Sequence, residues 1–168
     1  MDQTPPVWPS SLILVQRIIP DPDSNVGPAT AVTYYDSKAG GNLIQITPNN
    51  SSEPVLWDLE LSTHHSYYFT PSTQTCKAID FPVGILRRNW LKDAEPMGEV
   101  ASWDGGGPVC GWTKADFIDY YADKETGKPS HWYFHTMKAT FQVLYYEANP
   151  SIDQSLFVPP DYCIEEKK

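Results

Sequence analysis

The stretch VLWDLELSTHHSYYFT, residues 55–70, decides the fold class. In its first half the residues alternate, so that one side of an extended chain carries Val55, Trp57, Leu59 and Leu61, and the other Leu56, Asp58 and Glu60. Such strict alternation is typical of a β-strand with one face in the protein core. A very short turn leads into a second alternating segment, 64–70, and the two segments predict neighbouring strands. We interpret the face with Asp58 and Glu60 as solvated.

Further strands are predicted on both sides of this pair. They cover residues 11–19, 30–36, 42–47, 75–81, 98–103, 110–121, 131–137 and 140–146. The centre of segment 110–121 also fits a helical turn. A single short helix is predicted over 85–94, where Ile85, Leu86 and Trp90 share one stripe. Short strands with one helix, and no regular alternation of strand and helix, predict a mainly β fold: a curved antiparallel sheet or half-open barrel.

Size, composition and charge bound the organisation and the partners. The 168 residues suit one domain, which we place at 10–164, between a loose arm (1–9) and a tail (165–168). Aromatic residues make up 13% of the chain and there are 16 prolines, a combination that favours strands and turns. The net charge of −9 disfavours nucleic acid and anionic membranes as partners. No run approaches the ~18 apolar residues of a membrane-spanning helix.

Cysteine and asparagine patterns indicate an extracellular or endomembrane protein. The three cysteines form no C-x-x-C pair. The sequence NNSS holds two overlapping glycosylation sequons, at Asn49 and Asn50, in a polar turn. We therefore expect an acidic, disulfide-linked glycoprotein that is secreted or resides in the endomembrane lumen. The chain shows no signal peptide, and we expect that one has been removed.

The candidate catalytic residues do not assemble into a recognised motif. His131 and His135 lie four residues apart, which on a strand separates them by about 13 Å. No G-x-S-x-G motif occurs, and Cys110, within GPVCGW, lacks the context of a catalytic thiol. The glycine run after Asp104 lacks the strand, helix and lysine of a phosphate loop. From the residues alone we predict no catalytic residue, no metal site and no cofactor.

Three motifs carry a family resemblance: VGILRRNWL (83–91), DFIDYYADKETGKPSHW (116–132) and the ending PDYC (160–163). In these motifs the chain resembles a family of small secreted proteins of plants and algae. That family is largely uncharacterised, and some of its members are labelled glycosyl-group transferases. The order of features, including YYDSKAGGNL (34–43) and the final cysteine, is also remotely similar to that of the ependymin-related proteins.

The resemblance implies a fold and a binding site. It implies curved antiparallel sheets like those of the bacterial lipoprotein carriers, around a deep apolar pocket. Within that resemblance, the expected disulfide joins Cys76 to Cys163, because this bridge closes a long loop and ties the C-terminus to the sheet. Cys110 would then be free or bonded to another molecule.

We therefore predict a secreted, non-catalytic protein that holds an apolar or amphipathic small molecule or lipid in a concave pocket. Its predicted lining residues are Trp57, Leu59, Tyr67, Phe69, Trp132, Phe134, Phe141 and Tyr145. One alternative is a carbohydrate-active or ester-hydrolysing enzyme, for which the residues to examine are Asp116, Asp119, His131 and His135. The other alternative is an extracellular coat or interaction protein that forms homo-oligomers through exposed aromatic side chains.

Overall fold

The computed structural model describes residues 4–50, 52–80 and 84–164, which form one β-sheet of eleven strands. The strands are β1 (Ser11–Pro20), β2 (Ala29–Asp36), β3 (Gly41–Pro48), β4 (Leu56–Leu61), β5 (His65–Thr70), β6 (Thr75–Asp80), β7 (Glu95–Val100), β8 (Val109–Lys114), β9 (Ile118–Asp123), β10 (Pro129–Phe134) and β11 (Ala139–Ala148). A 3₁₀ turn, η1 (Gln154–Phe157), and a single-turn helix, α1 (Asp161–Ile164), follow. The mainly β fold class predicted from the sequence is confirmed.

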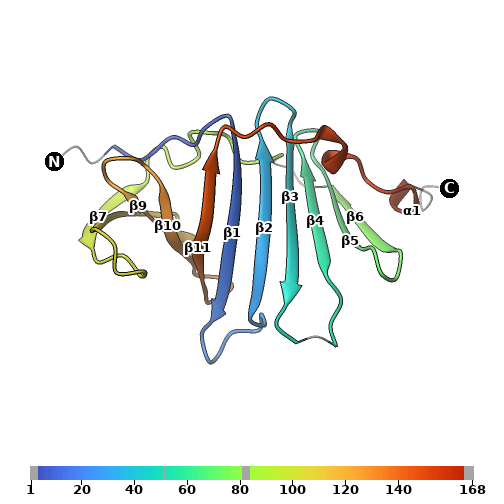
Figure 1. Cartoon of the computed structure of the whole chain (residues 1–168), viewed down its shortest axis with the longest axis horizontal. Helices are drawn as coiled ribbons and strands as arrows, with labels where there is room; N and C mark the ends of the chain where they lie inside the picture. Colours follow the sequence, from blue (N-terminus) through green and yellow to red (C-terminus); the bar gives the residue numbers. More distant parts are fainter. Residues whose placement is uncertain (1–3, 51, 81–83, 165–168) are drawn as a thin grey trace.

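The sheet is open, and the first and last strands of the chain meet in its middle. The strand order is β6-β5-β4-β3-β2-β1-β11-β10-β9-β8-β7, and the neighbouring strands are antiparallel. Figure 1 shows β11, β1, β2 and β3 side by side in the centre, with the outer strands bending away on either side. A register shift between Val15 and Gln16, where β1 pairs with β11, is the kind of irregularity that bends a sheet.

The two free edges of the sheet differ. All six residues of the edge strand β7 are exposed, and its register with β8 shifts between Pro96 and Gly98, where Gly98 has a φ of +89°. At the other edge, Cys76 of β6 forms a disulfide with Cys163 of α1, with an S–S distance of 2.06 Å and a Cα–Cα distance of 5.2 Å. The predicted cysteine pairing is confirmed, and the short helix α1 is fastened to β6.

Trp8 and residues 84–94, which we call the crossing segment, lie across the concave side of the sheet. The main-chain N–H of Trp8 donates to the carbonyl oxygen of Arg88 at 2.9 Å, and Arg88 Nε donates to the carbonyl oxygen of Trp8 at 2.8 Å. The hydroxyl of Tyr35, on β2, donates to the carbonyl oxygen of Leu86 at 2.7 Å. Trp8 is only 7% exposed, although it belongs to the part of the chain expected to be a loose arm.

The prediction of a helix over residues 85–94 is wrong, because this segment forms a series of turns. The main-chain N–H of Trp90 donates to the carbonyl oxygen of Arg87, three residues earlier, where an α-helix would join residues four apart. The carbonyl oxygens of Trp90 and Lys92 both accept a hydrogen bond from Nζ of Lys114 on β8. These carbonyl groups are therefore bonded to another part of the fold. Ile85 and Trp90 of the predicted stripe pack against the core without a helix, while Leu86 is 43% exposed.

The C-terminal segment covers the outer, convex face of β3, β4 and β5. Phe157 of η1 lies over Gly41, where an added Cβ atom would come within 2.3 Å of the ring. Leu43, Leu59 and Phe69 are buried beneath the segment in a core of their own. Figure 1 shows η1 in front of these strands. The outer side of this half of the sheet is therefore a packed interface within the molecule.

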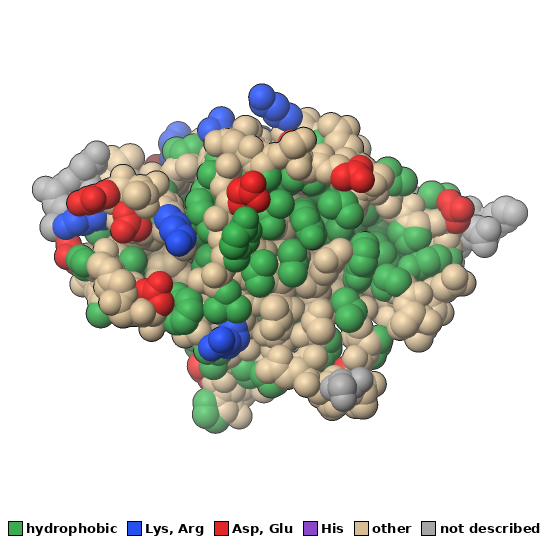
Figure 2. Space-filling view, viewed as in Figure 1, with side chains coloured by type: hydrophobic (Ala, Val, Ile, Leu, Met, Phe, Trp, Pro, Cys, Tyr) green, Lys and Arg blue, Asp and Glu red, His purple; other side chains and the backbone are tan. Residues whose placement is uncertain are grey.

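The rest of the outer face carries exposed hydrophobic side chains. Figure 2, viewed from the same side as Figure 1, shows such side chains spread across the central strands. Ile19 of β1 and Tyr145 of β11 are 40% and 51% exposed. Tyr145 pairs with Val15, which alternates along β1 with the buried Leu14 and Gln16, so the side chain of Tyr145 points away from the concave side.

Two strand predictions differ from the structure. Residues 110–121, expected as one strand or a helical turn, form β8 and β9, joined by a turn in which Ala115 and Asp116 have φ values of +54° and +51°. The strand expected over 98–103 is β7, which begins earlier and ends at Val100. Within the described residues, no helix has both the length and the apolar character needed to cross a membrane.

Candidate ligand-binding cavity

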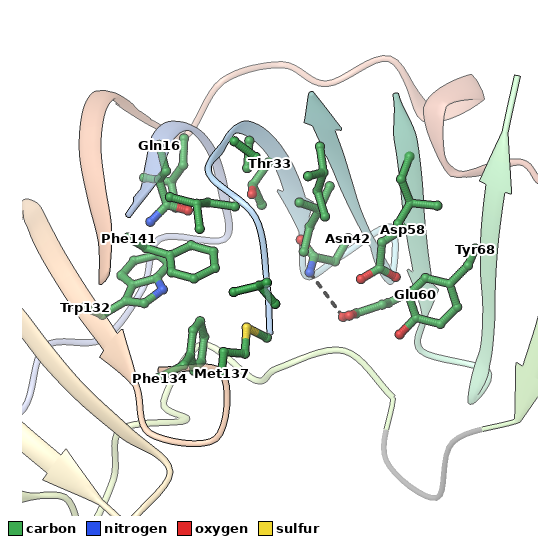
Figure 3. A pocket seen from close by; sticks show the side chains of 18 of the residues that line it. Gln16, Thr33, Asn42, Asp58, Glu60, Tyr68, Trp132, Phe134, Met137 and Phe141 are labelled. Carbon is green, nitrogen blue, oxygen red and sulfur yellow. Dashed lines mark hydrogen bonds between the residues drawn. The ribbon is translucent and has the colours of Figure 1, made fainter. Parts of the chain in front are cut away.

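The concave side of the sheet holds a cavity of about 950 Å³. Side chains from β1 to β5 and from β9 to β11 line it, and loops between strands form its margin. The margin includes Pro28 after β1, Pro54 before β4, Met137 between β10 and β11, and Leu86 of the crossing segment. Figure 3 shows side chains from both halves of the sheet around the same space.

One wall of the cavity, which we call the aromatic wall, consists of Trp132 and Phe134 of β10 and Phe141 of β11. Trp132 pairs with Phe141 across the two strands, and their rings stack with centroids 6.4 Å apart. Phe134 meets Phe141 edge-on at 5.1 Å. Trp132 also stacks on Tyr120 of β9 at 5.5 Å. Since such ring pairs contribute about 0.5–1.5 kcal/mol each, the aromatic wall is stabilised by contacts within the protein.

The other wall, which we call the acidic wall, consists of Asn42 of β3, Asp58 and Glu60 of β4, and Ser66 and Tyr68 of β5. Glu60 pairs with Asn42 on one side and Ser66 on the other, while Asp58 pairs with Tyr68. Directly opposite residues on antiparallel strands share a face of the sheet. Asn42 Nδ2 donates to Glu60 Oε2 at 3.2 Å, the dashed line in Figure 3.

Burial changes the protonation of the acidic wall. The pKa of Asp58 is raised from 3.8 to about 8. Burial is the largest cause, followed by the charge of Glu60 and a hydrogen bond with Glu60. Burial also raises the pKa of Glu60, although hydrogen bonds with Asn42 and Asp58 oppose the rise. Burial and the two carboxyl groups raise the pKa of Tyr68 to about 12. Near pH 7, Asp58 therefore keeps a proton that it shares with Glu60, and Tyr68 is neutral.

Several polar atoms of the cavity lining are shielded from solvent and have no hydrogen-bond partner among the described residues. They are Gln16 Nε2, Asn42 Oδ1, Asp58 Oδ1, Trp90 Nε1 and Trp132 Nε1. Gln16 and Asn42 are only 2% and 8% exposed. Because a buried polar group without a partner costs about 1–3 kcal/mol, these atoms favour a bound molecule that supplies the missing partners.

Three of the eight predicted lining residues, Trp132, Phe134 and Phe141, line the cavity. The other five do not: Trp57, Leu59, Tyr67, Phe69 and Tyr145 lie on the outer face of the sheet. The first four pack beneath the C-terminal segment. The strands of this pair were predicted correctly, but the face assigned to the pocket was the opposite one.

The polar face of β4 was also misassigned. Asp58 and Glu60 were interpreted as solvated, and they instead face the cavity. The residues that pair with them point the same way: Asn42, Ser66 and Tyr68. The signal that was missed is a group of polar residues in two neighbouring cross-strand rows, Asn42–Glu60–Ser66 and Asp58–Tyr68, on one face of three consecutive strands.

The residues examined for an enzyme lie outside the cavity. His135 Nε2 and Asp119 Oδ1 are 3.0 Å apart, and His131 stacks on Tyr121, with centroids 4.3 Å apart. Asp116 lies exposed in the β8–β9 turn. None of these residues lines the cavity. In the described part of the chain, no group of three or more His, Cys, Asp or Glu residues is placed to hold a metal ion.

The carboxyl pair of the acidic wall does not have the arrangement of a glycoside hydrolase. Such enzymes place two carboxyl groups across a cleft, about 5–9 Å apart, with the sugar between them. Asp58 and Glu60 come from one strand and hydrogen-bond each other on the same wall. Both carboxyl groups would therefore contact a ligand from the same side.

The remaining predicted sites are the two glycosylation sequons and Cys110. Asn49 and Asn50 are exposed at the turn between β3 and β4, and Ser51 of the first sequon lies outside the described residues. Cys110 is a free, buried cysteine of the core on the concave side. Its burial disfavours a bond to another molecule.

Comparison with known proteins shows a family and a fold. Residues 7–163 match the model of a domain of unknown function, DUF8395, and the chain therefore belongs to that family. A crystal structure of an uncharacterized conserved protein from Thermus thermophilus is similar, with a TM-score of 0.62 at 12% identity, over 90% of this chain and 86% of that one. At this identity the likeness concerns the fold alone. No curated protein matches the chain.

Proposed function

We propose that this member of the DUF8395 family is a secreted binding protein that holds an apolar or amphipathic small molecule in the cavity and does not transform it. The observation that carries the proposal is the cavity of about 950 Å³ on the concave side of the sheet. Its lining is mostly apolar, and most of its polar side chains belong to the acidic wall. Small-molecule sites typically have this size and this composition.

The floor between the two walls supports an apolar ligand. Ile18 of β1, Ile44 and Ile46 of β3 and Leu56 of β4 face the cavity there. Apolar surface that leaves water contributes about 25 cal/mol per Å². A hydrocarbon or ring system lying between the walls would remove these side chains from water, whereas a polar solute would not.

Secretion is supported by the covalent features of the chain. The disulfide between Cys76 and Cys163 is of a kind that persists in oxidising compartments and is rare in the cytosol. The exposed positions of Asn49 and Asn50 would allow a glycan to be attached without disturbing the core.

Binding of an apolar fluorescent dye tests the proposal, together with native mass spectrometry of protein isolated from its natural source. The informative variant is Ile46→Trp, which places a large ring inside the cavity. Gln45→Trp is the matched control, because Gln45 is the neighbouring residue of β3 and lies outside the cavity lining. We expect the wild type and Gln45→Trp to bind the dye, and Ile46→Trp to bind it about tenfold more weakly or worse.

Two results would contradict the proposal. The first is a wild-type protein that neither binds the dye nor carries a small molecule in the native spectrum. The second is equal dye binding by Ile46→Trp and Gln45→Trp, which would place the dye outside the cavity.

A further inference from the structure

We infer that the ligand is an amphipathic amine, whose protonated amino group is held by Asp58, Glu60 and Asn42 while its apolar part lies toward the aromatic wall. This inference rests on the proposed function, since it names the chemistry of the ligand in the same cavity. It is carried by three features of the acidic wall: its acceptor atoms, its charge and its position opposite an apolar wall.

The unpartnered atoms of the acidic wall are hydrogen-bond acceptors, whereas those elsewhere in the lining, Gln16 Nε2, Trp90 Nε1 and Trp132 Nε1, are donors. Asn42 is 8% exposed, and its Nδ2 donates to Glu60, so its Oδ1 is the atom left without a partner. Asp58 Oδ1 is also without a partner. The two residues lie in adjacent cross-strand rows of β3 and β4. An ammonium group has three N–H donors and no acceptor, which complements a site of carboxylate and amide oxygens.

The charge of the cavity lining has one sign. Its charged residues are Glu53, Asp58 and Glu60, and no Lys, Arg or His of the described chain is among them. Two ionised carboxylates buried side by side are unfavourable unless a proton or a cation accompanies them. No cationic side chain of the described residues lines the cavity, so a cationic ligand is the natural counterion. A fatty carboxylate would instead meet acidic groups and be disfavoured.

Of the groups around Asp58, only the carboxyl pair of Asp58 and Glu60 changes protonation when a cation binds. From β3 it meets Ile44, and from β5 Tyr68, which stays neutral near physiological pH. On its own strand it meets Glu60. When an ammonium ion binds, the proton shared by Asp58 and Glu60 leaves to solvent, so that one cation enters and one proton is released.

The test compares three probes with the same alkyl chain: decylamine, decanol and decanoate. Their affinities are measured by displacement of the apolar dye from the wild type, from the double variant Asp58→Asn/Glu60→Gln and from Glu147→Gln. Glu147 is a matched control because it is an exposed acid on β11 that does not line the cavity. We expect the wild type and Glu147→Gln to bind decylamine about tenfold or more tightly than decanol, and decanoate weakest.

In the double variant we expect decylamine to bind no better than decanol, while decanol binding stays unchanged and shows that the cavity is intact. Calorimetry in two buffers with different ionisation enthalpies should also show proton release when decylamine binds to the wild type. Equal binding of amine and alcohol by the wild type, or an amine preference that survives in the double variant, would overturn the inference and leave the proposed function standing. A wild type that binds none of the probes, nor the dye, would overturn both.

Discussion

The aromatic wall and the acidic wall face each other across one cavity, yet they are built in opposite ways. The rings of the aromatic wall pack on one another and on the core, as Trp132 does on Phe141 and Tyr120, and Trp132 Nε1 is the one polar atom of this wall without a partner among the described residues. The acidic wall brings Asp58 and Glu60 together without a cation and leaves Asn42 Oδ1 without a donor among the described residues. Ring packing stabilises the first wall without a ligand, whereas a bound cation would stabilise the second. We therefore expect the acidic wall to determine which ligand binds and the aromatic wall to contribute to the stability of the fold.

The largest expected effect is a loss of stability on the aromatic wall. Trp132→Ala removes a buried ring from the centre of the cluster and should cost about 3–5 kcal/mol. At this chain length each kcal/mol lowers the melting temperature by about 2–4 °C. Tyr145→Ala, on the outer face of β11, should change stability by about 0.5 kcal/mol or less. Thermal unfolding checks both, and similar losses would show that the aromatic wall has no special structural role.

The second effect concerns the support behind the acidic wall. The disulfide joins residues separated by 87 positions and fastens the C-terminal segment to this half of the sheet. The variant Cys76→Ser/Cys163→Ser should lose about 2–4 kcal/mol of unfolding free energy. Denaturant unfolding measures this loss, with Cys110→Ala as a control that leaves the bridge intact. An unchanged midpoint in the double variant would mean that the segment is held by packing alone.

The third effect is the response of amine binding to pH. Because the pKa of Asp58 is raised to about 8, an ammonium ion that takes the place of the shared proton releases it to solvent below that pH. Affinity for decylamine should therefore rise about tenfold per pH unit well below pH 8, and about fiftyfold from pH 6 to pH 8, which equals about 2.3 kcal/mol. Affinity for decanol should stay constant over the same range. If the affinity for decylamine does not change with pH, the acidic wall does not take part in ligand recognition.

The smallest expected effect is a gain of stability, opposite in sign to the loss expected for Trp132→Ala. The folded-state pKa of Asp58 is raised, so its contribution to stability is full below its unfolded-state pKa near 4 and is lost as pH rises toward 8. Asp58→Asn carries no such ionisation, and should stabilise the ligand-free protein by about 1–2 kcal/mol at pH 8. At pH 4 the variant and the wild type should be similar. Urea unfolding at both pH values measures the difference, and a destabilised variant at pH 8 would contradict this account.

The sequence predicted the strands of the sheet better than the direction in which it curves. Alternation in β4 correctly separated Trp57 from Asp58, but a local pattern does not say which face will be concave. That was decided by the C-terminal segment, where Phe157 and Cys163 cover the Trp57 face. The aromatic wall was predicted correctly because its face of β10 carries large apolar side chains, and no later segment among the described residues covers it.

The crossing segment shows a second limit of local patterns. Residues 85–94 have an apolar stripe that fits a helix, but the fully buried residue of the segment, Leu91, is not part of that stripe. Ile85 and Trp90 of the stripe pack against the core and are only partly buried. The backbone follows a different path because Trp8 and Lys114, distant in the sequence, bond to its main chain. The disulfide, by contrast, was predicted from resemblance and loop length, and the structure confirms it.

An open sheet carries a hazard that a closed barrel avoids, because unpaired strand edges invite further strands from other molecules. Both edges of this sheet carry features that oppose such growth. In β7, Pro96 lacks a main-chain N–H, and the shifted register next to Gly98 interrupts the row of hydrogen-bonding groups. At the other edge, the helix α1 is bonded covalently to β6 through Cys163. We therefore expect the disulfide to protect the protein against fibril-like assembly as well as against unfolding.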